Sequence, residues 1–182
     1  MVKIICEGGD DHSFLKLFLE HLNEDKSISN SINNFGSYIQ PMGGKSNLLN
    51  KEKYETINKQ IGKKIKKVLF IFDCDFLEDD AQCGDIDKSK ECIEKLIQQL
   101  DWKIEIDYYI FSKNLDYFLI DTLENKESFE SCEECLELKK VNKNRKILTC
   151  IYNKLYPNAP YNFSNDKFDD IKQKLKNLFE EQ

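Results

Sequence analysis

Residues 67–75 read KVLFIFDCD, an unbroken apolar run that ends at two aspartates, Asp73 and Asp75. A short apolar run of this kind predicts a buried β-strand, since a strand covered on both faces shows no polar alternation. A second such run, VKIIC at residues 2–6, is followed directly by Glu7. Both segments are therefore predicted to be buried strands, each ending in acidic residues.

The rest of the chain alternates between helix and strand patterns. Two further strands are expected, at residues 35–44 and 103–111. Helices are predicted between the strands from apolar residues at helical spacing, over residues 11–22, 46–65 and 87–100. After the last strand the pattern predicts only helices, at about 114–124, 128–140, 145–155 and 166–180.

This order predicts an α/β fold, a Rossmann-like three-layer domain with a mainly parallel four-stranded sheet and a helical C-terminal extension. We expect residues 1–115 to form the α/β core and residues 116–182 to form the extension, packed on the same domain. Right-handed crossovers place the carboxyl ends of parallel strands at one edge, where ligands bind in such sheets. If the strands at 2–6 and 67–75 are neighbours, their acidic ends meet at this edge.

The composition indicates a globular chain with enough material for a core. The chain has 182 residues, of which 40% are hydrophobic, and this length favours one domain. Its net charge of -6 argues against broad electrostatic binding to nucleic acid, although a local basic patch or metal-bridged phosphate contact stays possible. No apolar run approaches the roughly 20 residues needed to span a bilayer, so no membrane contact is expected.

The seven cysteines are an odd number without a repeated spacing. The opening apolar run is too short for a secretory signal peptide, so we expect reduced thiols and a cytoplasmic location. Cys132 and Cys135 form a C-x-x-C without a second pair at zinc spacing, and thiols on a helix face are favoured over a zinc site.

The acids at the two predicted strand ends suggest metal chemistry. Asp73 and Asp75 lie two residues apart, and on an extended chain their side chains point to the same side. A divalent cation would relieve their mutual repulsion, and oxygen-only ligands favour Mg²⁺ or Mn²⁺. Glu7 would be a further ligand, or a base acting on water at the metal.

The residues after Glu7 can serve either a phosphate or an ordinary turn. Gly8 and Gly9 would let the backbone turn tightly and let a phosphate approach closely. Asp10 is predicted to be a helix cap, and Asp11 a secondary metal ligand. Lys45 could also meet a phosphate; the alternative is a solvated lysine that starts a helix. Taken singly, each acidic cluster is explained better by turn and cap chemistry than by a metal site.

Together, the EGGDD and IFDCD segments resemble the TOPRIM domain, which topoisomerases, primases, small recombination proteins and nucleases of the OLD type share. Glu7 corresponds to the glutamate of the family pattern, Asp11 to an acid often found after it, and Asp73 and Asp75 to the aspartate pair. PMGGKSNLL at residues 41–49 is similar to a turn and helix start in small stand-alone TOPRIM proteins.

The resemblance covers roughly residues 1–115 and implies Mg²⁺-dependent phosphodiester chemistry. It implies that Glu7 is the general acid or base and that the aspartates hold metal. One departure is Gly84, which lies further from the aspartate pair than the corresponding glycine of many members, after a loop with additional acids.

Three functions are consistent with these patterns. The first is a Mg²⁺- or Mn²⁺-dependent nuclease or other phosphodiesterase, with DNA or RNA as its partner. The second is a non-catalytic module that binds nucleotide, nucleic acid or a protein, the latter through the C-terminal helices. The third is a haloacid-dehalogenase-type phosphatase, suggested by FIFDCDF at residues 70–76. In that family the aspartate pair ends the first core strand, which counts against it here.

The chain also has two basic runs, at residues 63–67 and 139–146. Each could follow a nucleic-acid backbone, but lysines that gather at helix ends on a solvated face are the default explanation.

Overall fold

The structure is a computed structural model that describes residues 1–28, 34–75, 77–122, 161 and 163–180. Four features predicted from the sequence lie outside these residues. They are the helices at 128–140 and 145–155, the Cys132 and Cys135 pair, and the basic run at 139–146.

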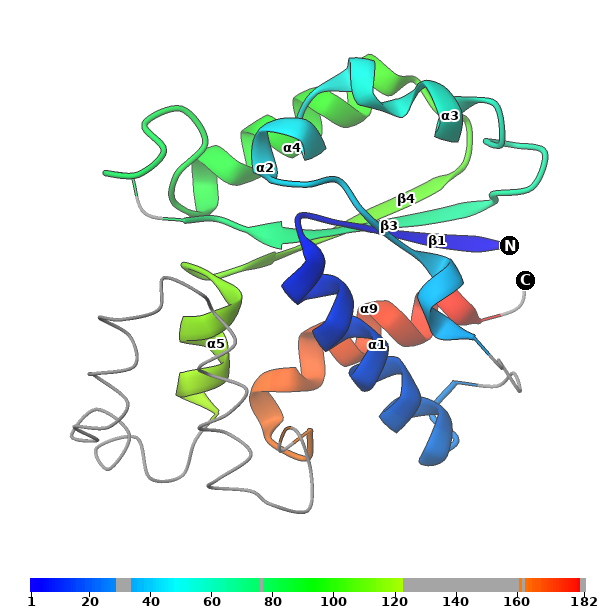
Figure 1. Cartoon of the computed structure of the whole chain (residues 1–182), viewed down its shortest axis with the longest axis vertical. Helices are drawn as coiled ribbons and strands as arrows, with labels where there is room; N and C mark the ends of the chain where they lie inside the picture. The colour runs from blue at the N-terminus through cyan, green and yellow to red at the C-terminus, as the bar shows by residue number, and fades with distance from the viewer. Residues whose placement is uncertain (29–33, 76, 123–160, 162, 181–182) are drawn as a thin grey trace.

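Four parallel strands form one sheet in the order β2-β1-β3-β4 (Figure 1). The strands are β1 (Val2–Cys6), β2 (Ile39–Pro41), β3 (Lys67–Asp73) and β4 (Glu105–Phe111). β1 pairs with β3 in register from Val2 beside Lys67 to Cys6 beside Ile71. The predicted α/β fold with a parallel four-stranded sheet is confirmed, and the two acid-terminated strands are neighbours.

Helices cover both faces of the sheet. The α-helices are α1 (Gly9–Glu24), α2 (Lys45–Leu48), α3 (Glu55–Asn58), α4 (Ile86–Leu100), α5 (Leu115–Asp121) and α9 (Asp169–Phe179). Short 3-10 helices are η1 (Phe35–Tyr38), η2 (Lys51–Tyr54) and η3 (Asp166–Phe168). Figure 1 shows α1, α5 and α9 on one side of the sheet and α2, α3 and α4 on the other.

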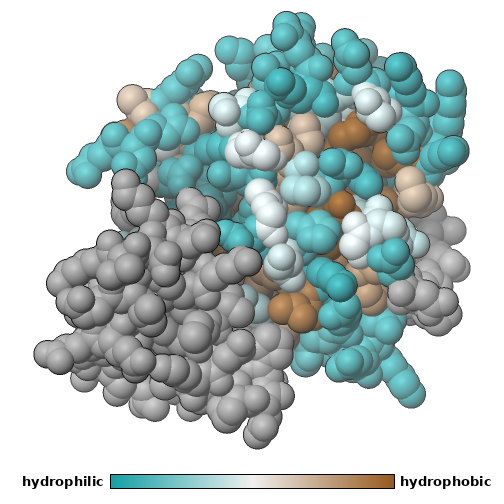
Figure 2. Space-filling model, viewed as in Figure 1, coloured by the Kyte–Doolittle hydropathy of each residue, from teal (hydrophilic) through white to brown (hydrophobic). Residues whose placement is uncertain are grey.

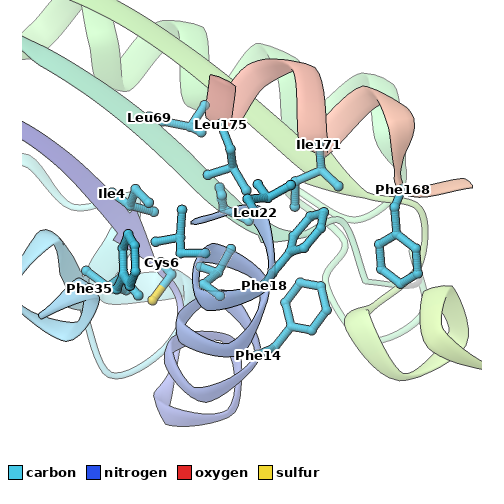
Figure 3. Packing of buried hydrophobic residues seen from close by; sticks show 14 of the residues in the cluster. Ile4, Cys6, Phe14, Phe18, Leu22, Phe35, Leu69, Phe168, Ile171 and Leu175 are labelled. Carbon is cyan, nitrogen blue, oxygen red and sulfur yellow. The ribbon is translucent and has the colours of Figure 1, made fainter. Parts of the chain in front are cut away.

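Side chains of β3 alternate between two buried clusters, because successive residues of a strand point to opposite faces. Leu69 and Ile71 belong to the cluster under α1 and α9, whereas Phe70 and Phe72 belong to the cluster under α2, α3 and α4. In the first cluster the rings of α1 meet Phe168 and the aliphatic residues of α9 (Figure 3). This burial on both faces explains the unbroken apolar run in the sequence.

Two predicted elements differ from the structure. Of the segment 35–44, only Ile39–Pro41 is strand, and Phe35–Tyr38 is a 3-10 turn. The predicted helix at 46–65 is divided into α2, η2 and α3. The Asn50 side chain accepts the Glu52 N–H and caps η2, which interrupts the helix although its apolar residues are buried as expected.

The cysteine prediction is wrong for one pair. Cys83 and Cys92 form a disulfide, while Cys6 and Cys74 are buried free thiols. The loop after β3 folds back on the start of α4, which brings Cys83 to Cys92. The odd cysteine count gives no hint of this contact.

The surface seen in Figure 2 is largely hydrophilic over the described residues, with hydrophobic residues in small separate patches. Of the helices that the structure describes, none combines the length and the apolar character that crossing a membrane requires.

Candidate metal site

Glu7 follows β1, and one of its carboxylate oxygens has no hydrogen-bond partner among the described residues. Its backbone carbonyl accepts the Gly44 N–H at 2.8 Å, which ties the turn after β2 to the end of β1. Its side-chain Oε2 atom is buried and makes no hydrogen bond within the described part of the chain. Buried polar atoms are nearly always paired, so this atom requires an explanation.

Asp73 ends β3 and is only 3% exposed. Its Oδ1 atom accepts the Leu115 N–H at 2.9 Å, which fixes the start of α5 at the end of β3. Burial raises the pKa of Asp73 to about 9, with further increases from the carboxylates of Asp11, Glu7 and Asp75. Asp73 therefore carries a proton at neutral pH in the metal-free protein.

The pKa of Glu7 is raised to about 7, first by burial and then by Asp11 and Asp75. A backbone hydrogen bond from Asp73 and the ammonium of Lys45 oppose this increase. These mutual effects indicate that the predicted acids share one region, at the carboxyl ends of β1 and β3. The pairing of these two strands is the cause.

Asp11 has a structural contact besides its predicted role as a metal ligand. It is 6% exposed, and its Oδ2 atom accepts the Gly8 N–H at 2.7 Å, in the capping arrangement of α1. The prediction that Asp10 is the cap is therefore wrong, because Asp10 is exposed and the capping contact comes from Asp11.

Gly8 and Gly9 were expected to permit a tight turn. The backbone at these two positions, however, does not require glycine. Gly8 has an extended φ of -139°, and a Cβ atom on Gly9 would meet nothing within 4 Å. Positive φ values occur instead at Gly43 and Gly44, 79° and 122°, directly before Lys45, and at Gly62. The open space at Gly9 leaves room for a phosphate, whose binding there stays a prediction.

Lys45 is 8% exposed and therefore not the solvated lysine of the alternative explanation. Its ammonium donates to the carbonyls of Cys74 and Cys83, both at 2.8 Å. It also forms ion pairs with Asp80 at 3.2 Å and Asp75 at 3.6 Å. These contacts are all with protein oxygens, so contact with a phosphate would require the ammonium to leave them.

Asp75 departs from the extended geometry that its spacing from Asp73 suggested. The strand ends at Asp73, and Asp75 has a left-handed φ of 59°. Its N–H donates to the Lys113 carbonyl at 2.6 Å, and its Oδ2 atom faces Lys45. The two aspartates are therefore held by different neighbours, Asp73 by α5 and Asp75 by Lys45.

Asp80 is a further residue of the site. The sequence indicated the acidic loop that contains it but no role for this residue. Its Oδ1 atom accepts the N–H groups of Gln82 and Cys83, and its Oδ2 atom faces Lys45. Burial opposes ionisation, but the hydrogen bond from Cys83 and the contact with Lys45 lower the pKa of Asp80 below its ordinary value.

The basic run at 63–67 does not extend this site. It precedes β3, so it lies at the amino edge of the sheet, opposite the acids. Lys67 there forms an ion pair with Glu105 at 3.4 Å.

The acids offer the type of donor atom that a hard divalent cation prefers, but they are not arranged as a set of metal ligands. Their donors are all oxygens, as Mg²⁺ and Mn²⁺ prefer, and Glu7 offers a buried atom without a partner among the described residues. Within the same part of the chain, however, no three His, Cys, Asp or Glu side chains form a group that could hold a metal ion. Binding would therefore require these carboxylates to move closer together.

Comparison with protein-family models, curated proteins and solved structures finds no match to this chain. The resemblance to the TOPRIM domain rests on the EGGDD and IFDCD segments and stays a prediction. A functional assignment therefore depends on the fold and on the contacts at the carboxyl edge of its sheet.

Proposed function

We propose that this protein is a Mg²⁺- or Mn²⁺-dependent phosphodiesterase that acts on nucleic acid. The observation that carries the proposal is the buried Oε2 atom of Glu7, which has no hydrogen-bond partner in the described part of the chain. It lies near Asp73, whose pKa is raised to about 9. Ligands bind at this edge of an α/β sheet. Buried carboxylates that repel one another there would be stabilised by the charge of a divalent cation. Strongly shifted pKa values also gather at functional sites.

Each acid has a role in this proposal. Glu7, Asp73 and Asp75 would hold the ion, with Asp11 assisting from the first turn of α1. When bound, the ion would supply positive charge opposite the phosphate oxygens. The pKa of Glu7, about 7, also suits a group that takes up or releases a proton near neutral pH.

Isosteric variants test this assignment. Asp73→Asn and Glu7→Gln are each expected to lower Mn²⁺-dependent cleavage of DNA or RNA about 10²-fold or more, the usual contribution of such groups. Glu20→Gln is the matched control, because Glu20 lies on α1 and its carboxylate faces Lys16 at the surface. Single-stranded and double-stranded substrates should be assayed side by side. Equal cleavage by all four proteins would contradict the assignment.

A binding module without turnover is the second candidate. It is favoured by the net charge of -6, which argues against broad electrostatic binding to nucleic acid. Calorimetry distinguishes the two functions, since this candidate requires metal or nucleotide binding with no cleavage of any nucleic acid. A protein partner at the C-terminal helices would support it further.

A phosphatase with Asp73 as nucleophile is less favoured. In haloacid-dehalogenase-type phosphatases the aspartate pair ends the first core strand, whereas Asp73 ends β3, the third strand along the chain. Trapping a phosphate mimic on Asp73 would restore this candidate.

A further inference from the structure

We propose that a pocket at the amino edge of the sheet binds a base of single-stranded nucleic acid, while lysines beside the pocket bind the phosphates. Binding there needs no metal ion and goes beyond the proposed function. The pocket has a volume of about 360 Å³ and lies between the turn after α3 and the connection from α4 to β4. Ligand pockets have volumes of about 300–1,000 Å³, so this one suits a single planar ring system rather than a large ligand.

Trp102, the one tryptophan of the chain, lines this pocket. Its ring lies at 15° to the ring of Phe70, with 6.2 Å between the centroids, and is nearly perpendicular to the ring of Tyr54. Its indole N–H donates to the Oδ1 atom of Asn58 at 2.7 Å. The protein therefore holds the indole in one position while leaving it partly exposed. Aromatic rings held in this way at a surface are the platforms on which nucleic-acid bases stack.

The rest of the lining is mostly apolar. Ile61, Leu100 and Ile104 are half-buried and add apolar surface beside the indole. Among the described residues that line the pocket, Asp101 is the one acid, and it forms an ion pair with Lys103. A planar ring would therefore enter the pocket without meeting an uncompensated carboxylate.

Lysines follow the pocket directly along the chain. Gly62 lines the pocket, and the next two residues, Lys63 and Lys64, are exposed. Neither lysine has an ion-pair partner within the part of the chain that the structure describes. The turn that carries them is closed by its backbone, because the N–H groups of Lys64 and Ile65 both donate to the Gln60 carbonyl, at 2.8 and 3.0 Å. Their charges are thus held beside the pocket and are available to phosphates.

Single-stranded nucleic acid is the ligand that matches both features. It combines bases with exposed flat faces and phosphates that lysines attract. In a duplex the bases are stacked inside the helix, so a duplex would contact the lysines without filling the pocket. In a chain with a net charge of -6, the basic run at 63–67 is a local exception. The seven residues of β3 place this pocket roughly 20 Å from the acids at the other edge.

The fluorescence of Trp102 tests the stacking directly, because the chain has no other tryptophan. In the presence of a chelator and at low salt, a single-stranded oligothymidylate of about ten nucleotides is expected to quench the emission. A duplex of the same length and inorganic polyphosphate are expected to leave it unchanged. Trp102→Leu should weaken binding of a fluorescein-labelled oligothymidylate about 10-fold, and Trp102→Phe, which keeps an aromatic ring, should weaken it less.

The salt dependence of binding tests the phosphate contacts. For single strands the logarithm of the affinity falls with the logarithm of the salt concentration by about 0.7 per phosphate contact. The double variant Lys63→Ala, Lys64→Ala should therefore lower this slope by about 1.4. The matched control is Lys16→Ala, Lys26→Ala, which removes two exposed lysines in and just after α1, on the other face of the sheet (Figure 1). Its slope should equal that of the wild type.

Several results would overturn the inference. They are unchanged emission with the oligothymidylate bound, equal affinity of the wild type and folded Trp102→Leu, equal affinity for single strand and duplex, and no binding of the oligothymidylate at low salt. If Trp102→Leu does not fold, the quenching of the wild type and the salt slopes still decide. Because these measurements use a chelator and the proposed function is tested by Mn²⁺-dependent cleavage, either can fail without the other.

Discussion

The buried carboxyl of Asp73 should make the stability of the metal-free protein fall as pH rises. Its pKa moves from an ordinary value of 3.8 to about 9 on folding, so the folded protein keeps a proton that the unfolded chain loses. The stabilisation is fully present below pH 3.8 and is lost as pH rises through 9. Each pH unit in this window costs about 1.4 kcal/mol of unfolding free energy.

Glu7 adds a second contribution with the same sign over a narrower window. Its pKa rises from 4.5 to about 7 on folding, so its contribution ends near pH 7. Between pH 5 and 7 both acids contribute to the fall in unfolding free energy, and above pH 7 Asp73 alone continues it. From pH 7 to 8.5 the expected loss is about 2 kcal/mol, a large part of a typical domain stability.

Asp73→Asn isolates the larger contribution. The amide has nearly the same volume and retains an oxygen that can accept the Leu115 N–H, but it cannot ionise. Urea unfolding in the presence of a chelator, at pH 6, 7, 8 and 8.5, measures the slope. We expect this variant to lose little stability above pH 7, while the exposed control Asp10→Asn follows the wild type. If the unfolding free energy fell equally steeply with pH in the wild type and in Asp73→Asn, the raised pKa of Asp73 would be refuted as the cause.

Three further predictions concern metal, the disulfide and the core. Mn²⁺ at about 100 times its dissociation constant should raise the unfolding free energy by about 2.7 kcal/mol in the wild type and much less in Asp73→Asn, measured by urea unfolding at pH 8. Cys92→Ser should lower stability by about 2–3 kcal/mol in non-reducing buffer, because Cys83 and Cys92 close a short loop, and the difference should vanish when the wild type is reduced. Phe18→Ala should cost about 3–5 kcal/mol by thermal or urea unfolding, since Phe18 is fully buried and stacks on Phe163 at 4.6 Å; no more than a small change is expected for Tyr117→Ala, which is 42% exposed.

The sheet could be predicted because its central strands are buried on both faces. β1 and β3 appear in the sequence as unbroken apolar runs. Their pairing was left open by the sequence and is established by the strand order β2-β1-β3-β4 of the structure. The secondary structure after β2 was harder to predict. The buried residues Leu48, Tyr54 and Ile57 have the spacing of one continuous helix, which the structure does not contain. The spacing of the apolar residues correctly predicts which of them are buried, but the cap formed by Asn50 divides the expected helix into short helical turns.

The site was predictable to the extent that it depends on the strand ends. Glu7 and Asp73 come to one edge because β1 and β3 are neighbours. The contacts of Lys45 were not predictable, since apart from Asp75 they are the carbonyls of Cys74 and Cys83 and the carboxylate of Asp80, in a segment without periodicity. That loop is closed by a contact between Cys83 and Cys92, which no spacing rule indicates.

The charges at this edge are compensated unevenly across the sheet. Toward α2 and α4, Lys45 forms ion pairs with both Asp75 and Asp80 and offsets part of their negative charge. Toward α1 and α5, Asp73 accepts the backbone N–H of Leu115 and faces neighbouring acids, which together with burial raise its pKa. A divalent ion would therefore gain most on the side of Glu7 and Asp73, where it would replace the proton that Asp73 holds. The same asymmetry accounts for a buried lysine and an unpartnered glutamate oxygen within the described part of one site.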